Sequence, residues 1–202
     1  MLFYFIFHTV LFSSSFPLIS IYQKTTNKAL HSYENRAFVY FLLARVLTDL
    51  SVFIFGRYFG NSMPVFHLSV IIEFILLILL LNHIHTINSK KLIILFGIVS
   101  FIADLTLTSD LFSNNLFSSI VTFGLVIGIT GKMIIRNNTS SKDELLVYSI
   151  FLYYILALSY TFFQKFNFQT ELLNDIAFYF FALATFVFNI SLSYVVCTVK
   201  PR

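Results

Sequence analysis

Residues 39–55 read VYFLLARVLTDLSVFIF, an apolar run that contains two charged residues, Arg45 and Asp49. A helix needs about 20 apolar residues to cross a hydrocarbon core about 30 Å thick, and this stretch with its flanks approaches that length. An unpaired charge at the centre of such a helix costs about 2.5 to 3.5 kcal/mol. The stretch therefore predicts a membrane-spanning helix whose two charges face the interior of a helix bundle.

The composition of the whole chain is that of a membrane protein. Of its 202 residues 58% are hydrophobic and only 11% are charged, which excludes an ordinary soluble domain. The apolar runs lack the alternation of barrel strands, so helices are expected. We predict an all-α, polytopic membrane helix bundle that forms a single domain, residues 1–202. Its seven transmembrane helices are expected at residues 2–22, 37–55, 65–84, 91–108, 116–135, 145–163 and 176–199.

The basic residues are distributed asymmetrically between the two sides of this bundle. Ten lie in the first, third and fifth connections and at the C-terminus, against two, Arg57 and Lys165, on the other side. The ten are Lys24, Lys28, Arg36, Lys90, Lys91, Lys132, Arg136, Lys142, Lys200 and Arg202. Because cytoplasmic connections retain Lys and Arg, we expect the N-terminus outside and the C-terminus in the cytoplasm, in the inner membrane. This bias accounts for the net charge of +4, so no direct nucleic-acid binding is expected.

The first segment, MLFYFIFHTVLFSSSFPLIS at residues 1–20, could instead be a cleaved signal peptide. It lacks a basic n-region and an A-x-A-like site, so a retained helix is favoured. Cys197 is the single cysteine, which excludes an intrachain disulfide and a cysteine-based metal site.

Several ionisable residues fall at similar depths in the outer half of the membrane. With about 1.5 Å of rise per residue, they lie roughly 9 to 12 Å from the outer boundary, with the arginine one turn deeper. This candidate polar cluster consists of Arg45, Asp49, Glu73, Asp104 and His8. Arg45 and Asp49 are four residues apart and can pair. Three carboxylates for one arginine leave two hypotheses open, an ion-pair network that fixes helix register and a functional polar cavity.

Other polar residues are placed by helical spacing. Two stripes of small and polar side chains are expected to face the interior. They are Gly97, Ser100, Asp104 and Thr108, and Ala182, Thr185, Asn189 and Ser193. Secondary candidates are His67, expected to be a solvated interfacial histidine, Asn61 and Asn189. His83 and His85 have poor spacing for a shared metal, and no H-x-x-x-H pair is present, so neither a metal nor a cofactor is predicted.

Gly124 and Gly128 form a G-x-x-x-G motif, which lets another helix approach closely. Packing within the bundle is the favoured interpretation, and homo-oligomerisation through these glycines is the alternative.

The run from residue 40 to 85, with its helix carrying a polar pair, its N-x-x-P-x-x-H connection and its helix carrying Glu, resembles a group of small multi-pass bacterial membrane proteins. The resemblance marks Asp49, Asn61, Pro64, His67 and Glu73, but implies no assigned chemistry. The Phe-rich, short-loop style is also similar to the accessory membrane proteins that accompany type VI-B CRISPR RNA-guided RNases.

Two classes of function follow. The favoured one is a non-enzymatic inner-membrane accessory protein, in contact with lipid and with a cytoplasmic protein partner, that modulates or executes the output of a partner system in CRISPR or phage defence. The alternative is an intramembrane enzyme or a small-solute or ion transporter that uses the acidic cavity. The sequence has no G-x-S-x-G, Walker or kinase motif, so no catalytic residue is assigned.

Overall fold

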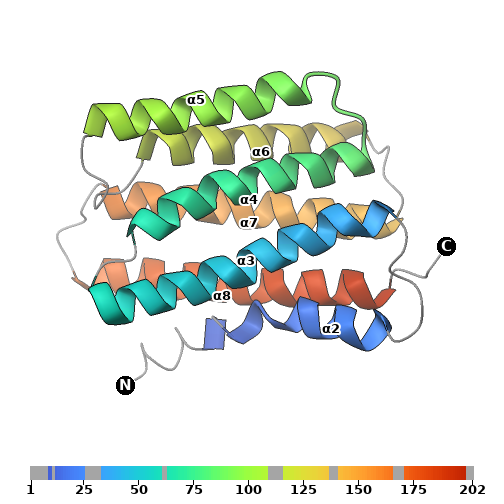
Figure 1. Cartoon of the computed structure of the whole chain (residues 1–202), viewed down its shortest axis with the longest axis horizontal. Helices are drawn as coiled ribbons and strands as arrows, with labels where there is room; N and C mark the ends of the chain where they lie inside the picture. Colours follow the sequence, from blue (N-terminus) through green and yellow to red (C-terminus); the bar gives the residue numbers. More distant parts are fainter. Residues whose placement is uncertain are drawn as a thin grey trace.

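The computed structural model describes residues 9–10, 12–25, 33–60, 63–108, 116–136, 141–165 and 171–198. Within this part of the chain the regular secondary structure is entirely helical (Figure 1). The helices are α2 (Phe16–Thr25), α3 (Tyr33–Phe59), α4 (Met63–Ile84), α5 (Lys90–Thr108), α6 (Leu116–Arg136), α7 (Ser141–Lys165) and α8 (Glu171–Thr198). The predicted all-α class is confirmed.

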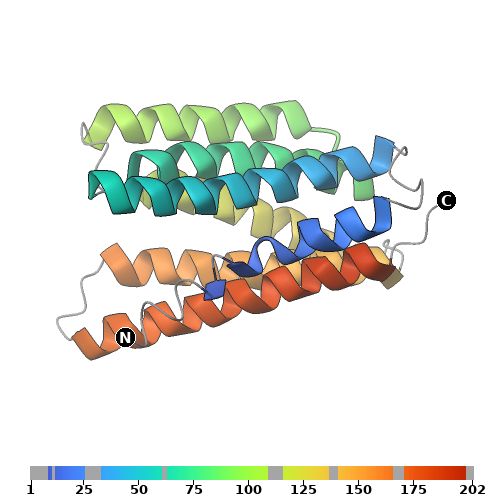
Figure 2. The same ribbon diagram turned by 60° about the horizontal axis from the view of Figure 1, so that its bottom comes forward.

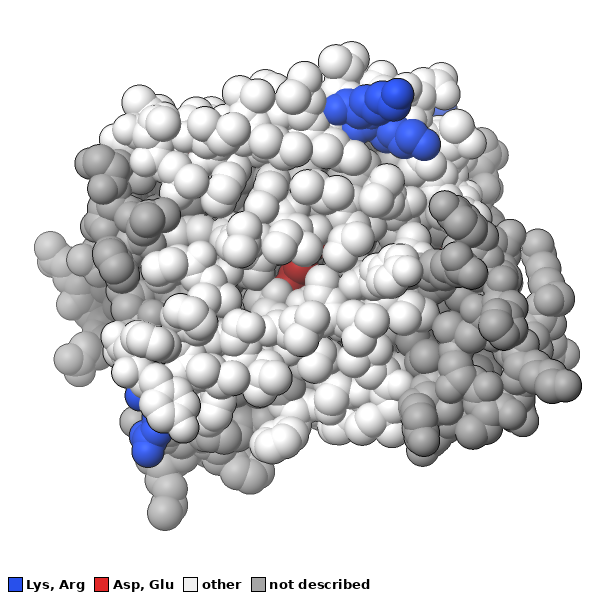
Figure 3. Space-filling model, in the orientation of Figure 1, with Lys and Arg blue, Asp and Glu red and all other residues white. Residues whose placement is uncertain are grey.

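Five of these helices are long and apolar enough to cross a membrane, namely Ala37–Phe59, His67–Ile84, Phe117–Arg136, Asp143–Phe162 and Asp175–Val195. Large apolar side chains such as Leu47, Leu95 and Leu152 are exposed on the outside of the bundle. On the face in Figure 3 the described basic side chains lie near the helix ends, and one acidic side chain shows in the middle of an otherwise uncharged surface. The basic residues near the helix ends and the uncharged surface between them are those expected of a bundle that contacts lipid.

The helices form two layers (Figures 1 and 2). One layer contains α3, α4 and α5, and the other contains α6, α7 and α8, with neighbours in the chain packed side by side. The layers join where α6 packs against α4 and α5, and where α2 packs against α8 and α3. Between these two seams, the middle of the layer interface is filled by side chains.

Several helices are longer than the apolar runs that predicted them. α3 begins at Tyr33 rather than residue 37 and ends at Phe59 rather than residue 55, and α8 begins at Glu171 rather than residue 176. An apolar run ends at the first polar residues, whereas the helical backbone continues through those residues. The end of α3 is set by Gly60, whose φ of 71° is the left-handed conformation that glycine adopts after a helix C-terminus.

The predicted uninterrupted helix over residues 2–22 is wrong in its described part. The backbone turns at Ser14 and Ser15 before α2 begins at Phe16, and the Ser15 amide donates to the Phe12 carbonyl at 3.1 Å, a tight i to i−3 bond. Pro17 has no N–H to donate to the carbonyl of Ser13. The hydroxyls of Ser13 and Ser15 donate to carbonyls three residues back, at 2.7 and 2.6 Å, and so compete with regular helix.

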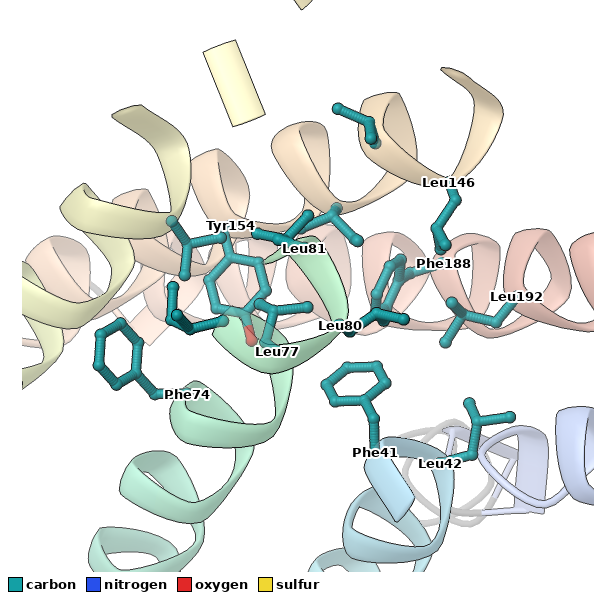
Figure 4. Close-up of a cluster of buried hydrophobic side chains, with 14 of the residues drawn as sticks. Phe41, Leu42, Phe74, Leu77, Leu80, Leu81, Leu146, Tyr154, Phe188 and Leu192 are labelled. Carbon is teal, nitrogen blue, oxygen red and sulfur yellow. The ribbon is translucent and has the colours of Figure 1, made fainter. Parts of the chain in front are cut away.

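The core lies where the two layers meet. Figure 4 shows Phe74 and Leu77 of α4 close to Tyr154 of α7, with Phe41 of α3 nearer to Phe188 of α8. All five side chains are buried. In lipid the gain comes from close van der Waals packing rather than from leaving water.

Glycines have different roles in α5 and α6. A Cβ added at Gly97 would run into the ring of Phe74, so this glycine lets α5 approach α4 closely. A Cβ at Gly124 or Gly128 would meet nothing within 4 Å, and both residues are exposed. The favoured interpretation of the G-x-x-x-G motif, packing within the bundle, is therefore wrong. The two glycines lie on the outer face of α6, so only the oligomerisation alternative stays a prediction.

Candidate functional site

The charged centre of the bundle is an ion pair between α3 and α4. Arg45 is buried, with 5% of its surface exposed, and its Nη1 donates to Glu73 Oε2 at 3.3 Å. The Glu73 side chain is 17% exposed and also accepts a hydrogen bond from the side chain of Thr48. An arginine in an apolar bundle needs such a partner, because a buried charge left alone is strongly destabilising.

Arg45 also reaches across to the second layer of helices. Its Nη2 donates to the Tyr153 hydroxyl at 3.5 Å, and its Cζ lies 5.0 Å from the centre of the Tyr153 ring and 5.1 Å from that of Phe188. The two rings are stacked, with centroids 4.4 Å apart and planes 9° apart. A cation over desolvated aromatic faces gains about 2 kcal/mol. Arg45 therefore connects α3 with α7 and α8 through its side chain.

Asp49 is not the ion-pair partner of Arg45 that the i, i+4 spacing predicted. It acts on Arg45 electrostatically, but its hydrogen bond comes from Ser14, and its Oδ2 is inaccessible to solvent and has no hydrogen-bond partner. Arg45 instead directs its two terminal nitrogens to other helices, Nη1 to Glu73 of α4 and Nη2 to Tyr153 of α7.

The centre therefore holds more acid than base. Arg45 supplies one positive charge, while Glu73 and Asp49 supply two carboxyl groups, so the three groups together carry a net charge of −1 when all are ionised. The Nε of Arg45 is buried and has no acceptor either. The hydrogen bonding of this centre is thus incomplete.

Asp104 lies apart from the centre, contrary to the predicted convergence of three carboxylates. It is buried on α5, and its Oδ2 accepts hydrogen bonds from the backbone N–H and the hydroxyl of Ser118, both at 2.9 Å. Ser118 is in the first turn of α6, where backbone N–H groups have no partner within the helix and where negative charge is favourable. Asp104 caps a neighbouring helix.

The remaining predicted residues divide into three groups. His8 and Asn61 lie outside the described residues. His67 is 3% exposed, so the prediction of a solvated histidine is wrong; α4 begins at Met63, which places His67 inside the helix on its buried side. Asn189 is fully buried, as the polar stripe on its helix predicted, and its Nδ2 donates to Ser13 Oγ at 2.9 Å.

Sequence reasoning missed the residues that complete the site. Tyr153 and Phe188 are aromatic positions among many in this chain, and nothing in their spacing marks them. Ser13 and Ser14 could have been found, because three serines followed closely by Pro17 are a signal for a broken helix.

In the part of the chain that the structure describes, no group of three or more His, Cys, Asp or Glu side chains could hold a metal ion. The fold and the site together define a helical bundle of membrane-spanning character with a buried, partly unsatisfied charged centre. Comparison with models of protein families, with curated proteins and with solved structures found no match. The two resemblances seen in the sequence stay predictions.

Proposed function

We propose that the protein crosses the inner membrane seven times, with its N-terminus outside, and that its charged centre moves a small cation or a proton across the membrane. The topology is supported by the described basic side chains. Lys90, Lys91, Lys132 and Arg136 lie at the end of the bundle where α4 ends and α5 begins, whereas Arg57 lies at the other end. Positive charge marks the cytoplasmic end.

The observation that supports transport is the acidic excess of the buried centre. Ionisable groups inside a membrane bundle are costly and mark ion or substrate pathways. Glu73 is bound by Arg45, but the Oδ2 of Asp49 has no partner. A bound proton or cation would balance the charge of Asp49 and supply the missing interaction.

The layered packing supports movement at this point. Arg45 holds the layers together in their middle through Glu73 on one side and through Tyr153 and Phe188 on the other. When Asp49 gains or loses a positive partner, the field on Arg45 changes, and with it the balance of these contacts. Binding of a proton or cation at Asp49 would in this way change the packing of the two helix layers through the Arg45 side chain.

The proposal is tested with the purified full-length protein in liposomes that contain a pH-sensitive dye. A gradient of Na+ or of protons is imposed, with the membrane potential fixed by K+ and valinomycin, and internal pH and Na+ uptake are recorded. We expect flux above that of protein-free liposomes, and its loss in Asp49→Asn. The matched control is Asp175→Asn, which removes an exposed carboxylate at the start of α8. Flux equal to that of empty liposomes, or undiminished flux in Asp49→Asn, contradicts the proposal.

The accessory role in phage defence stays a separate prediction. It is tested by co-expressing this protein with the product of a neighbouring gene and measuring whether that product's activity changes.

A further inference from the structure

The break before α2 is held against α8 by buried polar contacts. Ser13 and Asn189 are both fully buried, and Asn189 Nδ2 donates to Ser13 Oγ at 2.9 Å. Irregular backbone at membrane depth is tolerated where it is buried in protein or lines a cavity, because its polar groups need partners. In membrane transporters, breaks of this kind place carbonyl and side-chain oxygens around ions.

The hydrogen bonds of Ser13 fix the orientation of the Asn189 amide. The Ser13 hydroxyl has one proton, which it donates to the Val10 carbonyl at 2.7 Å. It can therefore only accept from Asn189, so the amide nitrogen must face Ser13 and the amide oxygen must face away. That oxygen, Oδ1, is inaccessible and has no hydrogen-bond partner.

Asp49 approaches the same break from α3. Its carboxyl group accepts a hydrogen bond from Ser14, the residue next to Ser13, and its Oδ2 is also buried without a partner. Asp49 of α3 and Asn189 of α8 are thus hydrogen-bonded to adjacent residues of the broken helix, and each has one further acceptor oxygen that is buried without a partner. Pro17 adds to the excess of acceptors, because it leaves the Ser13 carbonyl without its helical donor.

We propose that Asp49, Asn189 and the Ser13–Ser14 dipeptide bind a monovalent cation, with Na+ as the ion that fits the donor set. The donors are carboxylate, amide and hydroxyl oxygens, which suit hard cations. Asp49 offers one negative charge, and Glu73 is already bound by Arg45, so the site balances one positive charge rather than two. The inference deepens the proposed function, and rests on it for the role of the ion in transport.

The site is tested by thermal unfolding of the purified full-length protein in detergent. NaCl replaces choline chloride at constant ionic strength, so that only specific binding changes the midpoint. A ligand that binds the folded state alone raises the midpoint, and above its dissociation constant the rise grows with the logarithm of the ligand concentration. We expect this shift in the unmodified protein, its loss in Asn189→Leu and Asp49→Asn, and an onset at a higher Na+ concentration in Ser14→Ala.

The control variant is Ser191→Ala, which removes a hydroxyl of α8 whose contact is the Val187 carbonyl of its own helix. It should keep the full shift. Ser14→Ala removes only one oxygen, so it gives a reading even where Asn189→Leu does not fold. A shift with Na+ and K+ alike still supports a monovalent site. No shift in the unmodified protein, a shift with Mg2+ alone, or an unchanged shift in Asn189→Leu overturns it.

The two proposals fail in different ways. A shift of the midpoint with Na+ but without flux in liposomes supports the site and contradicts transport. Proton flux without a Na+ shift supports transport and overturns the cation site.

Discussion

Asp104 and Asp49 are both acidic residues within the apolar part of the bundle, yet their surroundings differ. Asp104 Oδ2 accepts two hydrogen bonds from Ser118, one of them from a helix N-terminus that needs an acceptor. Asp49 has one hydrogen bond from Ser14 and an Oδ2 without a partner, beside a buried arginine whose Nε is also unsatisfied. A satisfied buried carboxylate stabilises the fold, whereas an incompletely satisfied one is available to bind something else.

The largest effect is expected for Arg45→Leu. Removing the guanidinium leaves the largely buried Glu73 without its ion-pair partner, which should cost about 3 to 5 kcal/mol of unfolding free energy. The double variant Arg45→Leu with Glu73→Leu removes both charges and should recover much of that loss. The measurement is the unfolding midpoint in detergent, together with the folded yield.

The control for this prediction is the double variant Arg45→Leu with Asp49→Leu. If it recovers more stability than the variant that removes Glu73, then Asp49 is the main partner of Arg45 after all. The conclusion that Glu73, and not Asp49, is the ion-pair partner of Arg45 would then be wrong.

The second-largest loss of stability is expected for Asp104→Ala, which removes the carboxylate that accepts two hydrogen bonds from Ser118. The backbone N–H of Ser118 loses its acceptor in a buried place, which should lower the unfolding free energy by about 1 to 3 kcal/mol. Asp104→Asn keeps an acceptor oxygen and should lose less. Because Asp104 lies outside the charged centre, flux per folded molecule in liposomes should stay unchanged. Flux lost in Asp104→Ala at an unchanged midpoint would place Asp104 in the functional site.

The smallest effect is expected for Tyr153→Phe. The hydroxyl accepts a long hydrogen bond of 3.5 Å from Arg45, while the ring keeps its stack on Phe188. The change should cost less than about 1 kcal/mol of unfolding free energy. Tyr153→Leu removes the aromatic face and should cost more. Equal midpoints for the two variants would show that the ring contributes nothing to holding Arg45.

The sequence allowed the class of fold to be predicted because apolar length and composition are one-dimensional properties. It also placed Arg45, Asp104 and Asn189 inside the bundle, since helical spacing and the cost of exposed charge in lipid decide which side faces inward. The sequence did not allow the contacts between side chains of different helices to be predicted. The depth of a residue along a helix axis gives neither the rotation of the helix around that axis nor the identity of the facing helix. For this reason the predicted pairing of Arg45 with Asp49 is wrong, and so is the predicted place of Asp104 in the same polar cluster.

The contact between Ser13 and Asn189 shows the same limit more strongly. The two residues are 176 positions apart, and no local pattern connects them. The turn at Ser14 and Ser15 was locally encoded by serine and proline chemistry, but the apolar residues on both sides dominated the prediction of a continuous helix.

The short connection between α3 and α4 has a consequence for the order in which the protein is assembled. Arg45 and Glu73 are only 28 residues apart, and α4 begins at Met63, soon after the helix-ending Gly60. Both charges therefore lie in one helical hairpin, which can form the ion pair without any residue of α5 to α8. The hydrogen bond between Ser13 and Asn189 can form only after α8 has been made, so the break before α2 gains this contact late in synthesis. Truncation within α8 should leave an inserted hairpin with an intact ion pair and an open break beside Asp49.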